Sequence, residues 1–181
     1  MAGGNWHCRD GGWGAGVIVL GIDIGLTGAV AAVHPNGTAS VHDIPTVADG
    51  GKGRRICGRG LLLLLRELVA ADRAALVLFE DVRARPMGNG SGHGNTMHSQ
   101  GSLMRSRGIV EAAIDIARFD VCIVQPATWK RWHGLLKTEK GASLDLARSL
   151  YPALAGDLKR KKDHNRAESL LIAHYGKEDH A

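Results

Sequence analysis

The run 21–29 constrains this chain most, because it joins two apolar strands through a glycine-rich turn and carries one acid. The β-branched residues before it predict a buried strand over 17–23. Asp23 ends that strand, and a carboxylate there is costly unless it is hydrogen-bonded, paired or bound to a cation. Two glycines in the turn permit a tight reversal and the close approach of another group to the backbone. The apolar residues that follow predict a second strand over 28–34. The role of the acid therefore depends on whether other acids reach this turn.

Three strands and then alternating helices and strands make up the predicted order of the chain. The expected strands and helices, in the order strand, strand, strand, helix, strand, helix, strand, helix, helix, span 17–23, 28–34, 40–44, 61–71, 75–80, 102–118, 121–124, 142–150 and 166–175. Short turns favour antiparallel pairs, whereas a helix between two strands favours a parallel pair. We therefore expect an α/β, ribonuclease-H-like fold, with a five-stranded mixed sheet flanked by helices. Residues 47–60 and 84–100 are expected to be loops, residues 1–15 a flexible tail, and residues 16–181 one domain.

The composition favours a soluble protein with a polyanionic partner. The 181 residues carry a formal net charge of +5, and a basic surface attracts nucleic acid. The cysteines Cys8, Cys57 and Cys122 are odd in number and have no close pairs, which argues against a disulfide framework and against a zinc site. No stretch approaches the roughly 18 apolar residues that a membrane span requires. We therefore expect a cytoplasmic protein with no membrane partner.

Glu80 ends the predicted strand 75–80 just as Asp23 ends the first strand. If these two strands are neighbours, both carboxylates emerge at one edge of the sheet. Carboxylates and water are the ligands that Mg²⁺ and Mn²⁺ prefer, and two such ions can activate water and stabilise the leaving oxygen of a phosphodiester. Either acid alone is explained by pairing with a basic residue, but both at matching strand ends indicate a metal site.

A third acid, Glu168, precedes an apolar run near the C-terminus, where an unpaired carboxylate would be costly. The residues leave its partner open between two neighbours. His164 lies four residues earlier and would share a helix face with Glu168. Asp163 lies five residues earlier and can converge with Glu168 only if it stands at or before the first turn, where Asp is a favoured N-cap.

Four blocks of the sequence resemble the motifs of RuvC-type Holliday junction resolvases, the crossover junction endodeoxyribonucleases. The blocks are 21–28, 79–82, 126–130 and 163–173. The last block is closer in form to phage and organellar members than to typical bacterial members. The resemblance implies a homodimeric, Mg²⁺-dependent endonuclease that resolves four-way DNA junctions by paired symmetric nicks. It further implies a role in DNA recombination and repair, on nucleoid DNA.

The same resemblance implies roles for individual acids. Asp23, Glu80 and Glu168 match metal ligands of the family. The spacing of the last two acids resembles the organellar branch, which places Asp163 first as the fourth ligand, with His164 as the alternative. The set implies about two ions for each active site.

Two lysines and two departures complete the comparison with the family motifs. Lys130 and Lys140 match lysines that contact the scissile strand or its transition state, where a cation suits the developing phosphate charge. Asn165 stands three residues before the last acid, where many relatives carry an acid. No aromatic residue follows Glu80 to stack at the junction centre, so the loop 84–100 is the expected place for a lineage-specific DNA contact.

Other functions fit parts of the sequence. One alternative is a less selective nuclease for flaps, forks or RNA–DNA hybrids, and another is a non-catalytic junction-binding protein. The block 21–28 also resembles the first motif of ATP-binding proteins of the actin and Hsp70 type, but their two-lobed architecture needs far more than 181 residues.

Overall fold

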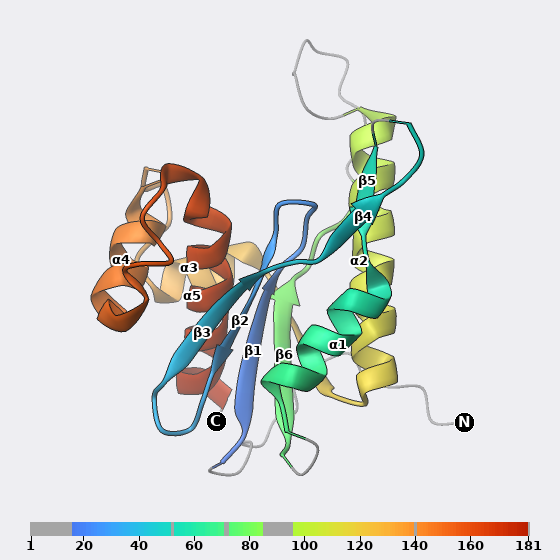
Figure 1. The fold of residues 1–181 in the computed structure, drawn as a ribbon. Coiled ribbons are helices and arrows are strands. Elements are labelled where there is room, and N and C mark those ends of the chain that lie inside the picture. Colours follow the sequence, from blue (N-terminus) through green and yellow to red (C-terminus); the bar gives the residue numbers. More distant parts are fainter. Residues whose placement is uncertain (1–15, 52, 71–72, 85–95, 140, 181) are drawn as a thin grey trace.

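A five-stranded mixed sheet lies between two groups of helices in the computed structural model (Figure 1), which describes residues 16–51, 53–70, 73–84, 96–139 and 141–180. The strand order is β3-β2-β1-β6-β7, and a second, two-stranded sheet pairs β4 with β5. The strands are β1 (Ile18–Asp23), β2 (Ala29–Val33), β3 (Ala39–Asp43), β4 (Thr46–Ala48), β5 (Arg54–Ile56), β6 (Ala75–Glu80) and β7 (Asp120–Val124). The helices are α1 (Gly58–Leu68), α2 (Met97–Ala117), α3 (Pro126–Trp132), α4 (Ala142–Leu150) and α5 (His164–His180), with the short 3-10 helices η1 (Pro152–Leu154) and η2 (Lys161–Asp163). This arrangement confirms the predicted ribonuclease-H-like fold.

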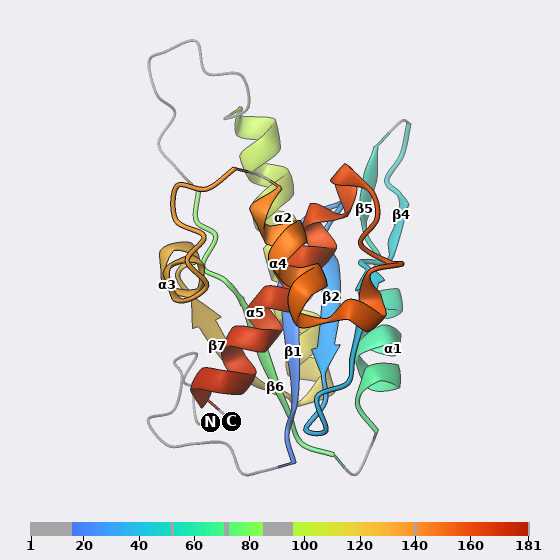
Figure 2. The ribbon, with the colours of Figure 1, turned by 90° about the vertical axis from the view of Figure 1, so that its left-hand side faces the viewer.

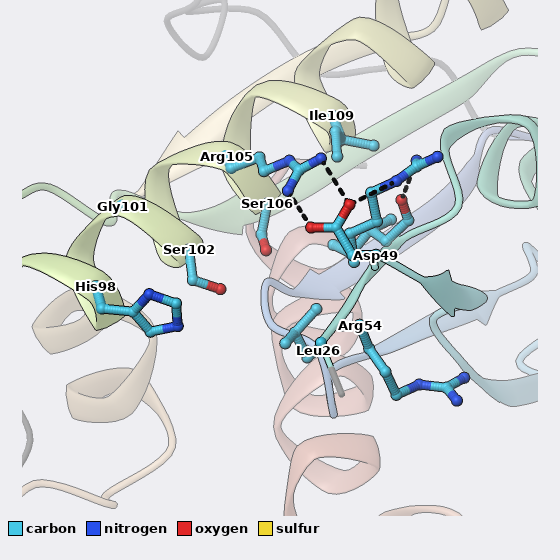
Figure 3. A pocket seen from close by; sticks show the side chains of 12 residues that line it. Leu26, Asp49, Arg54, His98, Gly101, Ser102, Arg105, Ser106 and Ile109 are labelled. Carbon is cyan, nitrogen blue, oxygen red and sulfur yellow. Dashed lines mark hydrogen bonds and ion pairs between the residues drawn. The ribbon is translucent and has the colours of Figure 1, made fainter. Parts of the chain in front are cut away.

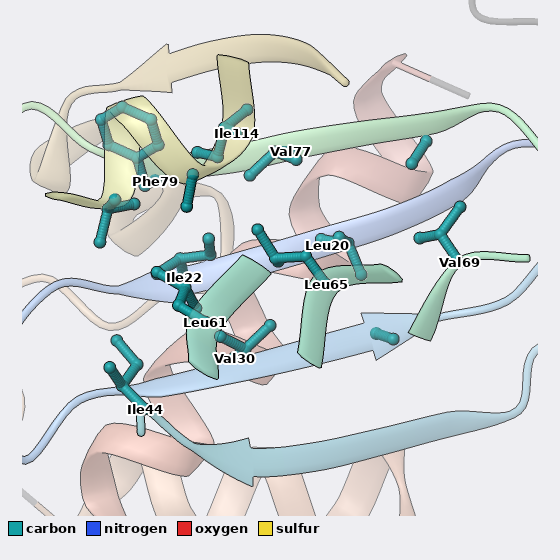
Figure 4. Close-up of a cluster of buried hydrophobic side chains, with 14 of the residues drawn as sticks. Leu20, Ile22, Val30, Ile44, Leu61, Leu65, Val69, Val77, Phe79 and Ile114 are labelled. Carbon is teal, nitrogen blue, oxygen red and sulfur yellow. The ribbon is translucent and has the colours of Figure 1, made fainter. Parts of the chain in front are cut away.

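Strand β1 is the centre of the sheet and has a core on each side. It pairs antiparallel with β2, which follows after a short turn, and parallel with β6, which follows after α1. Alternate residues of a strand face opposite sides. Leu20 and Ile22 accordingly join the core beneath α1 and α2 (Figure 4), whereas Val19 joins the core beneath α3, α4 and α5. Figure 2 shows α4 and α5 in front of the sheet on that second face.

Helix α5 packs against the backbone of β1, because two glycines leave room for it. A Cβ atom on Gly21 would collide with the backbone oxygen of Ser169 and would lie 2.5 Å from the backbone nitrogen of Ala173. On the helix, a Cβ atom on Gly176 would overlap the side chain of Leu78. This close approach sets the distance between the first turns of α5 and the sheet.

The predicted loops are too long at two places. The prediction of a loop over 47–60 is wrong, because this segment contains most of the hairpin β4–β5 and the start of α1. Strands of three residues are too short to leave a periodic pattern. Here they are held by backbone pairing and by the Arg54 side chain, whose Nε donates to Oγ1 of Thr46 at 3.0 Å. The predicted loop 84–100 also extends too far, since α2 begins directly after its N-cap, Thr96.

Some predictions fall outside the described residues. The predicted tail 1–15 and Lys140 both lie there. Cys122 in β7 is disulfide-bonded, whereas Cys57 is free. The argument against disulfides is therefore wrong for Cys122, because an odd number of cysteines still allows one pair. No helix in the described part of the chain is long and apolar enough to cross a membrane.

Candidate active site

The predicted acids of β1 and β6 stand at the carboxyl ends of two parallel neighbours. The register pairs Ile22 with Phe79, so the next residues, Asp23 and Glu80, lie opposite one another. Alternation along the strands directs both acids to the face that carries α5. Leu78, two residues before Glu80, belongs to the core on that face. Because the two strands are parallel neighbours, their carboxyl ends lie side by side, and the two acids are brought together there.

Glu168 reaches the same place from α5. It precedes Ser169, whose backbone crosses Gly21, so the close packing of α5 on β1 determines its position. The charge of Glu168 acts on both Asp23 and Glu80. The structure therefore brings together three of the four predicted ligands.

Burial and like charge raise the pKa of Asp23 to about 7. Burial contributes most, the charges of Glu168 and Glu80 add to it, and Lys130 acts in the opposite direction. Burial also raises the pKa of Glu80. The group carries more negative charge than its surroundings compensate, and a bound cation would relieve this excess.

Helix α3 holds two of the acids. The sequence pattern predicts no helix here, although the proline at its first position is favourable for a helix start. The fully buried Trp129 donates from Nε1 to Oε1 of Glu80 at 2.9 Å, which lowers the pKa of that carboxyl against the effect of burial. Lys130 Nζ lies 3.5 Å from Oε1 of Glu168 and 5.0 Å from the centroid of the Trp129 ring. One helix thus supplies an indole donor to one acid and an ammonium group to another.

Sequence reasoning assigned no role to Trp129. The available signal was its place beside Lys130 in the block 126–130, because a buried indole N–H normally finds an acceptor. Of the two predicted lysines, Lys130 joins the acids, and Lys140 lies outside the described residues.

Asp163 lies apart from the three acids, against Arg160. Its side chain is 3% exposed and accepts hydrogen bonds from the Arg160 guanidinium and from the Arg160 backbone N–H, each at 2.7 Å. Arg160 holds the pKa of Asp163 below its usual range, and Arg166 acts in the same direction. Asp163 ends η2 immediately before α5, in a capping position. The structure does not bring Asp163 to the other acids, so its role as a ligand stays a prediction.

The neighbours of Asp163 are also engaged elsewhere. His164 is exposed, and its Nδ1 lies 3.2 Å from the carbonyl oxygen of Lys161. Asn165 donates through Nδ2 to the carbonyl oxygen of Thr27 at 2.6 Å and to its Oγ1 at 3.0 Å. The residue three positions before Glu168 therefore ties α5 to the β1–β2 turn.

The three carboxylates fit a divalent metal by the chemistry of their donors, since hard oxygen ligands suit Mg²⁺ and Mn²⁺. Across the described ranges, no three Asp, Glu, His or Cys side chains are gathered tightly enough to hold a metal ion as they stand. Trp129 and Lys130 engage two of the carboxylates.

Comparison with known proteins gives a structural likeness. No protein-family model and no curated protein sequence matches the chain. The structure of T. thermophilus RuvC in complex with a Holliday junction substrate matches with a TM-score of 0.53 and 14% identity, over 90% of this chain and 96% of that chain. The yeast mitochondrial Holliday junction resolvase matches with a TM-score of 0.52 and 16% identity, over 87% of this chain and 76% of that one. The chain has the RuvC-type, ribonuclease-H-like fold.

Proposed function

We propose that this protein is a homodimeric, Mg²⁺-dependent endonuclease that resolves four-way DNA junctions by paired symmetric nicks, in DNA recombination and repair. The observation that carries the proposal is the convergence of Asp23, Glu80 and Glu168, with Lys130 beside them. Acids that hold two divalent metal ions together serve phosphodiester hydrolysis. The likeness in fold to two resolvases supports a four-way junction as substrate, and the net charge of +5 supports a DNA partner.

The acids are assigned to metal binding. Asp23, Glu80 and Glu168 would hold Mg²⁺ or Mn²⁺, with Asp163 as the predicted fourth ligand and His164 as the alternative. When bound, two such ions lower the pKa of the attacking water and stabilise charge on the leaving oxygen. Hydrolysis in this manner leaves a 5′-phosphate and a 3′-hydroxyl.

The residues of α3 position the reacting groups. Lys130 directs its ammonium group into the acid cluster, where it opposes the raised pKa of Asp23. The same cation would face the negative charge that develops on the phosphoryl oxygens, and such preorganised charge typically contributes about 3 kcal/mol. Trp129 holds Oε1 of Glu80 from a fully buried position, so that this carboxylate keeps its direction when DNA binds.

Cleavage of a synthetic four-way junction in Mg²⁺ tests the proposal. We expect two symmetric nicks from the wild type, and a rate at least about 100-fold lower from Asp23→Asn, because the variant removes one ligand charge. Asp145→Asn is the matched control, since Asp145 is an exposed acid on α4 whose partner is Arg148. We expect this control to cut as the wild type does.

Two results would contradict parts of the proposal. Cleavage that survives Asp23→Asn would overturn the assigned site. Equal rates on the junction and on a linear duplex of the same sequence would favour the less selective nuclease.

A non-catalytic junction-binding protein is the second candidate, and the surroundings of the fourth-ligand position favour it. Asp163 is paired with Arg160, and Asn165 is hydrogen-bonded to Thr27. Tight junction binding without nicks in either Mg²⁺ or Mn²⁺ would support this candidate.

A further inference from the structure

We infer that two basic cavities on either side of Leu26 form one trough that holds the phosphodiester backbone of a DNA arm beside the acid cluster. The inference rests on the proposed function, because it extends DNA binding beyond the acids. The first cavity, of about 690 Å³, lies between the hairpin β4–β5 and the N-terminal half of α2 (Figure 3). The second, of about 350 Å³, lies between the β1–β2 turn, the end of β3 and residues 160–166. Leu26, at the tip of the turn, lines both.

Arg54 is the uncompensated cation of the first cavity. Its Nε donates to Oγ1 of Thr46 at 3.0 Å, and its Nη2 donates to the carbonyl oxygen of Thr46 at 3.2 Å. These bonds fix the direction of the guanidinium but leave its charge unbalanced, since no acid among the described residues pairs with it. Thr46 lines the second cavity. Arg54 therefore stands where the two cavities meet.

Asp49 lines the first cavity and joins its two sides. Its carboxylate pairs with Arg105 of α2 and, at 3.3 Å, with Arg55 of β5. One acid thus ties the hairpin to the helix, as Figure 3 shows for Asp49 and Arg105. The three arginines of this cavity face a single aspartate, so the cavity keeps a positive charge after its wall is formed.

Lys162 is the uncompensated cation of the second cavity, as Arg54 is of the first. The ion pairs of that wall join Arg160 to Asp163 at 2.7 Å and Arg166 to Asp43 at 2.6 Å. Lys162 is exposed, and none of the acids in the described part of the chain pairs with it. Each cavity therefore combines cations that are fixed by acids with one that is available to a ligand.

The layout fits a polyanion better than a single small anion. The cations come from β5, α2, η2 and α5 and line two cavities that share Leu26, so that one phosphate would meet only some of them. Between the cavities, Leu26 is 38% exposed and offers an apolar surface. A nucleic-acid backbone repeats phosphates with sugars between them, and proteins contact both. The trough passes the turn that follows Asp23, so a strand in the trough leads to the acid cluster.

Binding of a fluorescent four-way junction in EDTA, where no strand is cut, tests the trough. Arg54→Ala and Lys162→Ala are each expected to weaken binding roughly 5- to 10-fold and to reduce the slope of log affinity against log salt by about 0.9, the value for one lost phosphate contact. The double variant should lose about twice that slope, because the two cations contact different phosphates of one molecule. Arg54→Lys should restore the slope, which a purely structural role of the Thr46 contacts would not allow.

Arg73→Ala is the matched control. Arg73 is an exposed arginine before β6, at the opposite end of that strand from Glu80. We expect the wild-type affinity and slope from this variant. Thermal unfolding of each variant establishes that it is folded.

Three outcomes would overturn the trough. The first is a wild-type affinity and salt slope in both single variants. The second is a double variant with the slope of a single one. The third is displacement of DNA by inorganic phosphate at constant ionic strength, which would identify a small-anion site.

The binding and cleavage experiments distinguish an error in the proposed trough from an error in the proposed function. Unchanged binding by Arg54→Ala together with normal junction cleavage would overturn the trough alone. A different result is also possible: the variants lose DNA binding, and the wild type cuts no junction in Mg²⁺ or Mn²⁺. This result would support the trough and overturn the proposed nuclease activity.

Discussion

At the scale of single residues, two consecutive acids differ in their surroundings. Glu80 faces α5, and burial raises its pKa. Asp81 points elsewhere and pairs with Arg83 at 2.6 Å and with Arg107 at 3.2 Å, and these partners hold its pKa below the usual range. The direction of the side chain, which alternates along a strand, therefore decides whether an acid is neutralised by the protein or left to a cation.

Replacing Asp23 by asparagine should stabilise the protein in EDTA at about pH 8. The pKa of the carboxyl is about 7 in the folded chain and 3.8 as its ordinary value, so the folded state binds this proton more tightly. Its contribution to stability is complete below about pH 4 and is lost as the pH rises to about 7, by roughly 4 kcal/mol at most. Urea unfolding at low and high pH measures the effect. A wild type that is more stable than Asp23→Asn at high pH without metal would contradict the assignment.

Replacing Trp129 by phenylalanine should shift the pH dependence of cleavage. The variant removes the Nε1 donor to Glu80, and loss of a hydrogen bond to a carboxylate raises its pKa. The acidic limb of the pH–rate profile should therefore move to higher pH, with a rate about 10-fold lower near neutrality. An unchanged profile in a folded variant would show that the indole does not tune Glu80.

At the scale of elements, the packing of α5 on β1 builds the site. Two acids arrive on strands that are hydrogen-bonded neighbours, but the third arrives on a helix that is joined to the sheet by packing and by side-chain contacts such as that of Asn165 with Thr27. Gly21 and Gly176 allow that helix to approach closely. Helix α3 then adds an indole donor to Glu80 and an ammonium group beside Glu168.

Gly21→Ala should destabilise the fold by about 3 kcal/mol or more, because the added Cβ meets backbone atoms of α5 that cannot rotate away. Gly108→Ala is the contrasting control. A Cβ on this α2 glycine meets nothing within 4 Å, and alanine should stabilise the helix by up to about 1 kcal/mol. Chemical denaturation measures both effects. Equal stability of the two variants would refute close α5–β1 packing.

At the scale of the whole molecule, paired nicks require two active sites. The described chain carries one cluster of Asp23, Glu80 and Glu168, and a two-fold dimer would present two clusters to opposed strands. The predicted homodimer follows from this requirement and from the resemblance to resolvases.

Mixing wild type with Asp23→Asn tests the dimer on a plasmid that extrudes a cruciform. If subunits exchange, about half of the dimers at equal ratio carry one active site. These dimers should nick one strand of the plasmid, so that nicked circles form in place of linear product. If the total activity falls only in proportion to the fraction of wild type, and nicked circles do not increase, each chain cuts alone. Analytical ultracentrifugation gives the oligomeric state independently.

The sequence by itself determined the sheet and two of its acids. Short apolar runs that end in Asp23 and Glu80 carry their own signal, because strand length, β-branching and the turn glycines are local properties. The succession of strands and helices along the chain indicated a mixed sheet, and the position of Glu168 before an apolar run marked it as an acid in need of a partner. The hairpin β4–β5 left no such signal, since three-residue strands have no measurable period.

Only the tertiary structure decided which groups share a site. Trp129 donates to Glu80 across 49 positions of sequence separation, a pairing that no local pattern encodes. Asp163 accepts from Arg160 instead of joining the other acids, because a nearby guanidinium satisfies it at the start of α5. The trough likewise depends on Leu26 meeting two cavities from distant segments. Local properties of the sequence determine the strands and turns, whereas long-range packing determines which charged groups face one another.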